Sequence, residues 1–204
     1  MLFTATVAPN TLGLLIELMH KPYLNGFNLV GGTALSMQIG HRISIDLDML
    51  TTEAFDTNEL KSKLEDDYSV FQVLQESQNT LITTINDIKV DFILFKYGFT
   101  YPIIIEKEIR LVNIKDIASV KLDAITGRGK KKDFFDLYFL LKKYTLPELF
   151  DLYQEKYQHT TIFHVIKSMV YFQDADKEPE PIIIDKKVVW TKVKRMLTEE
   201  VSKL

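Results

Sequence analysis

Two aspartates one residue apart, Asp46 and Asp48, are the residues of this 204-residue chain whose types and spacing point most directly to chemistry. They lie in the stretch "ISIDLDML", where apolar and polar residues alternate as in a strand with one buried face. That spacing places both carboxylates on one face, about 6–7 Å apart along the strand. Because Mg²⁺ takes oxygen ligands from one or two carboxylates together with substrate phosphate, the pair is a candidate metal site. The alternative is a solvated strand end.

A third carboxylate, Asp91, lies inside the strand-like run "IKVDFILF". Its neighbours Val90 and Phe92 fall on the opposite face of that strand. We expect Asp91 either to complete a cluster with the aspartate pair or to be a satisfied surface residue of an antiparallel sheet.

A pair of glycines, Gly31 and Gly32, ends the apolar run "FNLV", and Thr33 opens a helical segment. Glycines let backbone N–H groups approach a phosphate closely, and a helix N-terminus favours an anion. The turn is neither a P-loop nor a dinucleotide-binding fingerprint, since the further residues of both motifs are missing. A tight strand-to-helix turn with a threonine cap is the simpler alternative.

Lys121 falls within the apolar stripe of a helix expected over residues 113–127, and Arg128 follows seven residues later. A lysine on an inward face needs a partner, and a triphosphate would be one. The alternative is that its amine extends to the surface along the apolar stem. Arg42, just before the aspartate pair, could reach a phosphate or pair with an acid.

Asp133 is expected to be the N-cap of a helix that begins with "FFDLYFLL", with Asp136 in its first turn. The alternative for both is a role near a nucleotide. The adjacent lysines 130–132 are expected to form a solvated loop or to contact a nucleic-acid acceptor.

The elements that must position these residues divide the chain near Val112-Asn113. Before it, helical segments mix with strand-like runs at residues 27–32, 44–50, 70–77, 79–86, 88–97 and 101–112, and after it nearly every segment is helical. We therefore expect an α+β fold, with a mixed sheet flanked by helices over residues 1–112. A helical bundle over residues 113–204 is expected to pack on that core and to close a cleft.

Composition excludes several classes. The chain has no cysteine and therefore no thiolate zinc site, and its net charge of −3 argues against a generally basic nucleic-acid binder. The apolar stretch "LGLLIELMH" is too short to span a bilayer, and no signal-peptide pattern is present, so we expect a cytoplasmic protein without membrane partners. His20, His159 and His164 show no metal-ligand spacing.

The arrangement Gly31-Gly32-Thr33, then Asp46-Leu47-Asp48, then Asp91 resembles the DNA polymerase β-like nucleotidyltransferase superfamily. Two longer strings, "LVGGTALSMQIGHRISIDLDML" and "SVKLDAITGRGKKKDFFDLYFLL", are similar to the AbiEii/AbiGii toxin family. The resemblance implies a nucleotidyltransferase-type mixed sheet followed by a helical domain.

The resemblance also implies roles for individual residues. Asp46, Asp48 and Asp91 would bind Mg²⁺, two ions being expected, and Asp91 would also activate the acceptor hydroxyl. The family's later lysine matches Lys121, which joins the catalytic set, and its terminal aspartate motif matches Asp133 and Asp136. The residues expected to hold the nucleoside triphosphate are Gly31, Gly32, Thr33, Arg42, Lys121, Arg128 and Asp136.

The expected reaction moves a nucleoside monophosphate from a triphosphate to a hydroxyl of RNA, with tRNA favoured, or of protein. The resemblance further implies a toxin paired with a cognate antitoxin. One alternative is a non-catalytic nucleotide- or partner-binding module of the same fold. Another is a metal-dependent nuclease, suggested by Lys96 five residues after Asp91, which leaves the glycine turn unexplained.

Overall fold

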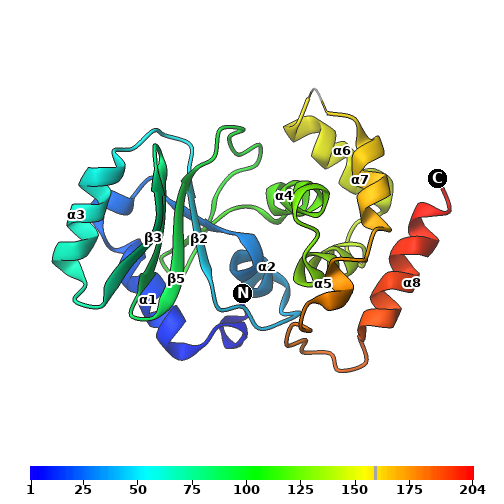
Figure 1. The fold of residues 1–204 in the computed structure, drawn as a ribbon, viewed down its shortest axis with the longest axis horizontal. Helices are drawn as coiled ribbons and strands as arrows, with labels where there is room; N and C mark the ends of the chain where they lie inside the picture. Colours follow the sequence, from blue (N-terminus) through cyan, green and yellow to red (C-terminus); the bar gives the residue numbers. More distant parts are fainter. Residues whose placement is uncertain (159) are drawn as a thin grey trace. The chain divides into compact units, whose positions relative to one another are not determined.

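The computed structural model describes residues 1–158 and 160–204, so His159 lies outside the described residues. The chain forms two compact units, coloured along the sequence in Figure 1. The first contains Met1–Ile39 and Ser44–Asn113, and the second contains Gly40–Ile43 and Ile114–Leu204. Four residues between the glycine turn and the aspartate pair therefore belong to the second unit.

The first unit is built on a mixed sheet whose described strands follow the order β3-β4-β5-β2-β1-β7-β6. The strands are β1 (Asn28–Val30), β2 (Leu47–Thr51), β3 (Phe71–Ser77), β4 (Thr80–Ile85), β5 (Ile88–Leu94), β6 (Ile104–Glu106) and β7 (Ile109–Leu111). The central strand β2 is antiparallel to β1 and parallel to β5. These pairings confirm the expected α+β class with a mixed sheet.

Hairpins of this sheet turn on residues with positive φ. Asn79 lies between β3 and β4 with φ of 57°. Asn86 and Asp87 connect β4 to β5 with φ of 49° and 62°, in a tight turn of the kind that Asn and Asp favour. Lys107 and Glu108 make an equivalent turn, with φ of 51° and 64°, between β6 and β7. The single strand region expected over residues 101–112 is therefore a hairpin.

The helices of the first unit are α1 (Pro9–Met19), α2 (Gly31–Ile39) and α3 (Thr57–Asp67), with 3₁₀ turns at Thr4–Thr6 and Pro22–Leu24. Two of these helices begin in different ways. Helix α1 begins at Pro9, which suits a first helical position because the N–H that proline lacks would be unpaired there. Helix α3 is capped by Asp56, whose side chain accepts from the N–H groups of Asn58 and Glu59.

The core of the first unit lies around β2 and β5, which run side by side in Figure 1. Leu47 and Met49 on β2, and Val90 and Phe92 on β5, have no exposed surface. Ile45, expected on the same buried face, lies before β2 begins and is 65% exposed. The buried alternation therefore starts only at Leu47.

The second unit consists of helices around α4. They are α4 (Ile114–Gly127), α5 (Lys131–Leu140), α6 (Leu146–Lys156), α7 (Ile162–Met169) and α8 (Trp190–Val201), with a 3₁₀ turn at Ala175–Lys177. Helix α4 packs against α5, α6 and α7, and α8 packs against α5 and α7. Trp190 on α8 makes ring contacts with Phe134, Phe135 and Phe172. Among the described residues, no helix is long and apolar enough to cross a membrane.

Residues 40–43 join this unit as a short extended segment. Arg42 lies opposite Ile183 in an antiparallel bridge. Ile43 N donates to Ile182 O at 2.8 Å, and Ile184 N donates to His41 O at 3.0 Å. Gly40 enters the segment with φ of 67°, a conformation that glycine adopts without strain.

Candidate active site

Gly31 is required by the side chain that lies against it. It follows β1 as the first residue of α2, with φ of 69°, and a Cβ at this position would lie 1.9 Å from Oδ2 of Asp48. No side chain fits in that space, so the glycine both makes the turn into α2 and leaves room for the Asp48 carboxylate. The glycine turn and the aspartate pair, which are separate in sequence, therefore meet at one place.

Asp48 and Asp91 lie directly opposite each other on the neighbouring parallel strands β2 and β5. Adjacent strands are about 4.8 Å apart, so side chains at paired positions share a face and approach closely. Asp48 is partly exposed and Asp91 is 9% exposed. Asp46 is partly exposed and precedes the first residue of β2. The register thus brings together two of the three predicted carboxylates, with the third two residues along.

The Asp91 carboxylate is bound by Lys89, whose Nζ is 2.5 Å from each of its oxygens. Within the part of the chain that the structure describes, no group of three or more His, Asp or Glu side chains is arranged to hold a metal ion. The three aspartates nevertheless supply the oxygen donors that Mg²⁺ prefers. The register that pairs Asp48 with Asp91 is compatible with such a site.

Thr33 ties the glycine turn to the segment that carries the aspartates. Its side chain is fully buried, and its hydroxyl donates to the carbonyl oxygen of Asp46. The same hydroxyl is 2.9 Å from Oγ of Ser44. The predicted phosphate-binding hydroxyl is therefore engaged in positioning the chain that leads to Asp46.

Lys121 is the centre of a buried ion cluster in the second unit. Its side chain is 2% exposed, with Nζ 2.8 Å from Oδ1 of Asp133 and 2.7 Å from Oδ2 of Asp136. Both carboxylates have no exposed surface. The amine does not extend to the surface, and the partner that the sequence required is a pair of protein carboxylates.

The segment 40–43 supplies the next members of this cluster. Arg42 donates from Nε to Oδ1 of Asp136 at 2.6 Å and from Nη2 to Oδ2 at 3.1 Å, a two-pronged pairing. His41 Nε2 is 2.7 Å from the same Oδ1, and His41 Nδ1 has no hydrogen-bond partner. Since a carboxylate only accepts, Nε2 carries the proton.

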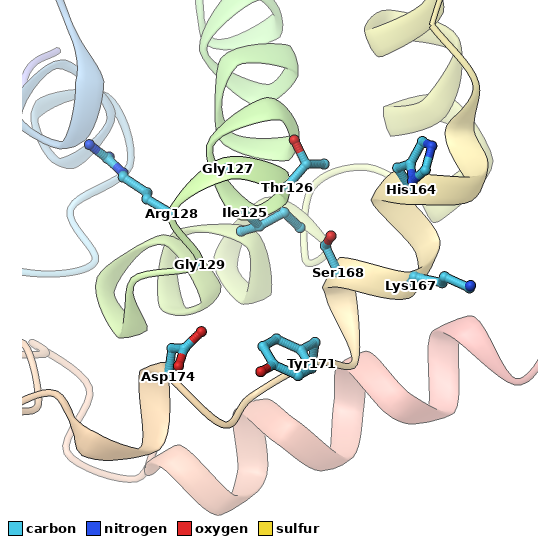
Figure 2. A pocket seen from close by; sticks show the side chains of 10 residues that line it. All are labelled: Ile125, Thr126, Gly127, Arg128, Gly129, His164, Lys167, Ser168, Tyr171 and Asp174. Atoms are coloured by element: carbon cyan, nitrogen blue, oxygen red, sulfur yellow. The ribbon is translucent and has the colours of Figure 1, made fainter.

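Arg128 is a solvent-exposed member of the ion cluster. It donates from Nε to Oδ2 of Asp133 at 2.9 Å and from Nη2 to Oδ1 at 3.1 Å, while its side chain stays 51% exposed. A hollow of about 350 Å³ lies beside it, between the Gly127–Gly129 turn and α7. Figure 2 shows the Arg128 side chain directed away from Ser168 and Tyr171, which line this hollow. The Arg128 guanidinium therefore belongs to the ion cluster.

At the carboxylates of Asp133 and Asp136, burial and the neighbouring cations shift the pKa in opposite directions. Burial by itself raises the pKa of Asp136, but Arg42 and Lys121 outweigh it and hold that pKa well below 3.8. Burial likewise raises the pKa of Asp133, and Lys121 and Arg128 more than offset it. Both aspartates are therefore ionised at neutral pH.

The pKa values of the two bases Lys121 and His41 shift in opposite directions. Burial lowers the pKa of Lys121, but Asp136 and Asp133 overcome this and raise it above 10.5. Burial also lowers the pKa of His41, and here the Asp136 contact does not compensate, so the pKa stays below 6.5. At neutral pH Lys121 is a cation and His41 is neutral.

The expected capping role of Asp133 is wrong. Helix α5 begins at Lys131 after Lys130, which makes no side-chain cap, so Asp133 lies inside the first turn. The helix starts one turn earlier because the break falls at Gly129, with φ of 49°. The pairing of Lys121 with both aspartates was not predicted from the sequence, although an inward lysine and two acids on one helical turn were the available signal.

Two solved structures are similar in fold to this chain. MenT4, the nucleotidyltransferase toxin Rv2826c of Mycobacterium tuberculosis H37Rv, aligns over 88% of this chain and 76% of its own, with a TM-score of 0.56 and 15% identity. JHP933 of Helicobacter pylori aligns over 97% and 94%, with a TM-score of 0.55 and 16% identity. The fold is that of a nucleotidyltransferase.

The sequence comparisons narrow the class to one family. The family described as "Nucleotidyl transferase AbiEii toxin, Type IV TA system" matches residues 13–103 and 87–203. The protein aq_aa25 of Aquifex aeolicus (strain VF5) is 36% identical over 188 residues, 87% of each chain. This chain belongs to the AbiEii nucleotidyltransferase family, as its motifs predicted.

Proposed function

We propose that this protein transfers a nucleoside monophosphate from a nucleoside triphosphate to a hydroxyl of RNA, with tRNA the favoured acceptor. The acceptor hydroxyl oxygen forms the new bond to the α-phosphorus, and pyrophosphate leaves. The register that sets Asp48 opposite Asp91, beside the side-chain-free Gly31, is the observation that carries this proposal. It is the arrangement in which one sheet face can present carboxylates to metal ions next to a phosphate-binding turn. Family membership supports the same reaction class.

In this proposal Asp46, Asp48 and Asp91 hold two Mg²⁺ ions. The ions would supply charge stabilisation at the attacking and leaving oxygens. Backbone N–H groups at the Gly31-Gly32 turn and the start of α2 bind triphosphate oxygens, because the positive end of a helix favours anions. Asp91, the most buried of the three carboxylates, takes the proton of the acceptor hydroxyl.

Arg128 is the member of the ion cluster that we assign to phosphate binding, because about half of its side chain remains exposed. Lys121 acts behind it as a buried cation between Asp133 and Asp136. Lys130, which is exposed, is the residue we assign to the RNA backbone. The expected solvated loop ends there, because Lys131 begins α5 and is buried, with its amine donating to the carbonyl oxygen of Glu178. The family's description as a type IV toxin further supports a cognate antitoxin as partner and the cytoplasm as the place of action.

The decisive experiment is a label-transfer assay. Each α-labelled nucleoside triphosphate is incubated with the protein, Mg²⁺ and either total RNA, tRNA or no added acceptor. We expect label in tRNA, and its loss with Asp48→Asn or with the double variant Asp46→Asn/Asp48→Asn. Asp66→Asn, which removes an exposed carboxylate on α3, is the matched control and should retain activity.

The other outcomes separate the alternatives. Label on the protein itself would identify a protein hydroxyl as the acceptor. Metal-dependent nucleotide binding without any transfer, in the presence of every acceptor, would favour a non-catalytic binding module. RNA shortened without added nucleotide would favour a nuclease.

A further inference from the structure

The segment Gly40–Ile43 leads directly into Ser44 and the aspartate pair but folds as part of the second unit. It is held there at both backbone and side-chain level. Its backbone pairs with residues 182–184, and its two charged or polar side chains, His41 and Arg42, both bind Asp136. Residues 41–43, which lie shortly before Asp46 in sequence, are therefore held by residues of the second unit.

All three guanidinium nitrogens of Arg42 are bound within the protein in this arrangement. Nε and Nη2 are bound to the two oxygens of Asp136, and Nη1 donates to the carbonyl oxygen of Ile43 at 3.0 Å. The side chain is 4% exposed. The bidentate bond to Asp136 and the bond to the Ile43 carbonyl link the backbone of residues 42–43 to helix α5.

On the opposite side of Ser44 the chain is held by a different contact. The buried Thr33 hydroxyl donates to Asp46 O and lies 2.9 Å from Ser44 Oγ. Residues 41–43 are thus held by Asp136 and the 182–184 segment. Residues 44–46 are held by Thr33 and by Thr6, whose carbonyl oxygen accepts from Ser44 N at 2.9 Å.

We propose that Arg42, acting through Asp136, is a positioning residue that holds the segment before β2 and thereby fixes Asp46 and Asp48. Its catalytic consequence rests on the proposed transfer reaction, whereas its effect on the chain does not. Asp136 belongs to the same anchor, which gives this aspartate a role in aligning the carboxylates and not in contacting nucleotide.

The structure supplies a matched control in the second unit. Lys156 pairs with Asp116 at 2.5 Å, and both side chains are 1% exposed. This pair is as buried as Arg42 and Asp136 but joins α4 to α6 and involves no residue of the segment 40–43. Breaking it perturbs the same unit without releasing the aspartates.

The first test uses amide hydrogen exchange on the full chain without metal or nucleotide. We expect Arg42→Gln to speed exchange in peptides covering residues 42–51 by about tenfold or more, and Arg42→Lys to do so by less, since local opening is what such exchange measures. Lys156→Gln should leave these peptides unchanged. Equal exchange in the two glutamine variants would overturn the proposal, and if Arg42→Gln does not fold, Arg42→Lys decides.

The second test uses transfer kinetics. We expect Arg42→Lys to lower kcat by about 10- to 100-fold and to raise the Mg²⁺ concentration needed for half-maximal rate, with the KM for nucleotide nearly unchanged, as for residues that orient metal ligands. Lys156→Gln should change neither. A raised KM at constant kcat would overturn the proposal by making Arg42 a nucleotide ligand. If the native protein transfers nothing, the proposed function fails, while hydrogen exchange still decides whether Arg42 anchors the segment.

Discussion

Gly31 shows how strictly one residue can be determined by its surroundings. Its backbone is left-handed, with φ of 69°, and the Asp48 carboxylate occupies the space that a Cβ would take. The sequence indicated a turn here, because glycine pairs between a strand and a helix usually mark one. It could not indicate the contact with Asp48, which depends on β1 and β2 being neighbours.

Gly31→Ala is expected to destabilise the fold by about 1–3 kcal/mol and to abolish transfer, because the new methyl group must displace the Asp48 carboxylate. Gly13→Ala is the control. Gly13 lies exposed within α1, and a Cβ added there would have no neighbouring atom within 4 Å, so alanine should stabilise by about 0.5–1 kcal/mol. Thermal unfolding and label transfer measure both effects, and an active Gly31→Ala enzyme would contradict the first.

The ion cluster makes stability depend on pH. The pKa of His41 is lowered in the folded state, so below about pH 6.5 the unfolded chain takes up a proton that the folded chain resists. Stability should therefore fall as the pH drops below 6.5, by at most about 1.4 kcal/mol per pH unit for this group. The lowered pKa values of Asp133 and Asp136 add a second loss below about pH 4.

Unfolding temperatures measured between pH 8 and pH 3 test this dependence. His41→Gln keeps a donor for Asp136 but cannot titrate, so its curve should be flatter than the native one between pH 6.5 and 5. Parallel curves for the two proteins over that range would exclude His41 as the group responsible. The loss below pH 4 should persist in the variant.

The strands and helices were predicted well where local chemistry and long-range packing agree. The Asn86-Asp87 turn was recognisable because these residues tolerate positive φ. The β6–β7 hairpin was not, because Lys107 and Glu108 are poor turn residues held at positive φ by the pairing of their strands. The α5 start was misplaced for a similar reason, since burial of Asp133 against Lys121 outweighs its preference for a cap.

Glu108→Gly should stabilise the protein by about 1 kcal/mol, because glycine adopts the left-handed conformation that costs a glutamate about that much. The lost pair with His20 is exposed on both sides and contributes little. Asp87→Gly at the equivalent place in the β4–β5 turn should give a smaller gain, because aspartate tolerates positive φ better than glutamate does. Chemical denaturation measures both changes, and a loss of stability in either variant would contradict the strain argument.

The chain passes between the two units at more places than the change in sequence pattern near residue 113 indicates. The sequence pattern changes at residue 113, and the contacts divide there too, but residues 40–43 lie on the other side of that division. Nothing local in "GHRI" reveals this, because its partners are 94 residues away at Asp136 and farther still at Ile182–Ile184. The pair Asp46 and Asp48 could be predicted as candidate ligands from the sequence because its spacing is local. The anchoring of the segment before it could not be predicted, because those contacts are distant.

A fragment covering residues 114–204 should therefore be much less stable than the same residues in the full chain. It would leave Asp136 buried with Lys121 but without Arg42 and His41, and breaking a buried ion pair by removing one partner costs about 3–5 kcal/mol. Circular dichroism of the fragment should show loss of helix at temperatures where the full chain is folded. A fragment that melts like the intact protein would mean that the segment 40–43 contributes nothing to this unit.

The distant anchoring also sets an order of events during synthesis. Asp46 and Asp48 leave the ribosome soon after Arg42, but Asp136 follows Arg42 by 94 residues, about 5–20 s later at ordinary elongation rates. Until then the nascent chain carries its aspartates without the residue that fastens the segment before them. A product that stops between Asp91 and Asp136 would thus have every predicted metal ligand and still lack the anchor, so activity would arise only after Asp136 has been synthesised.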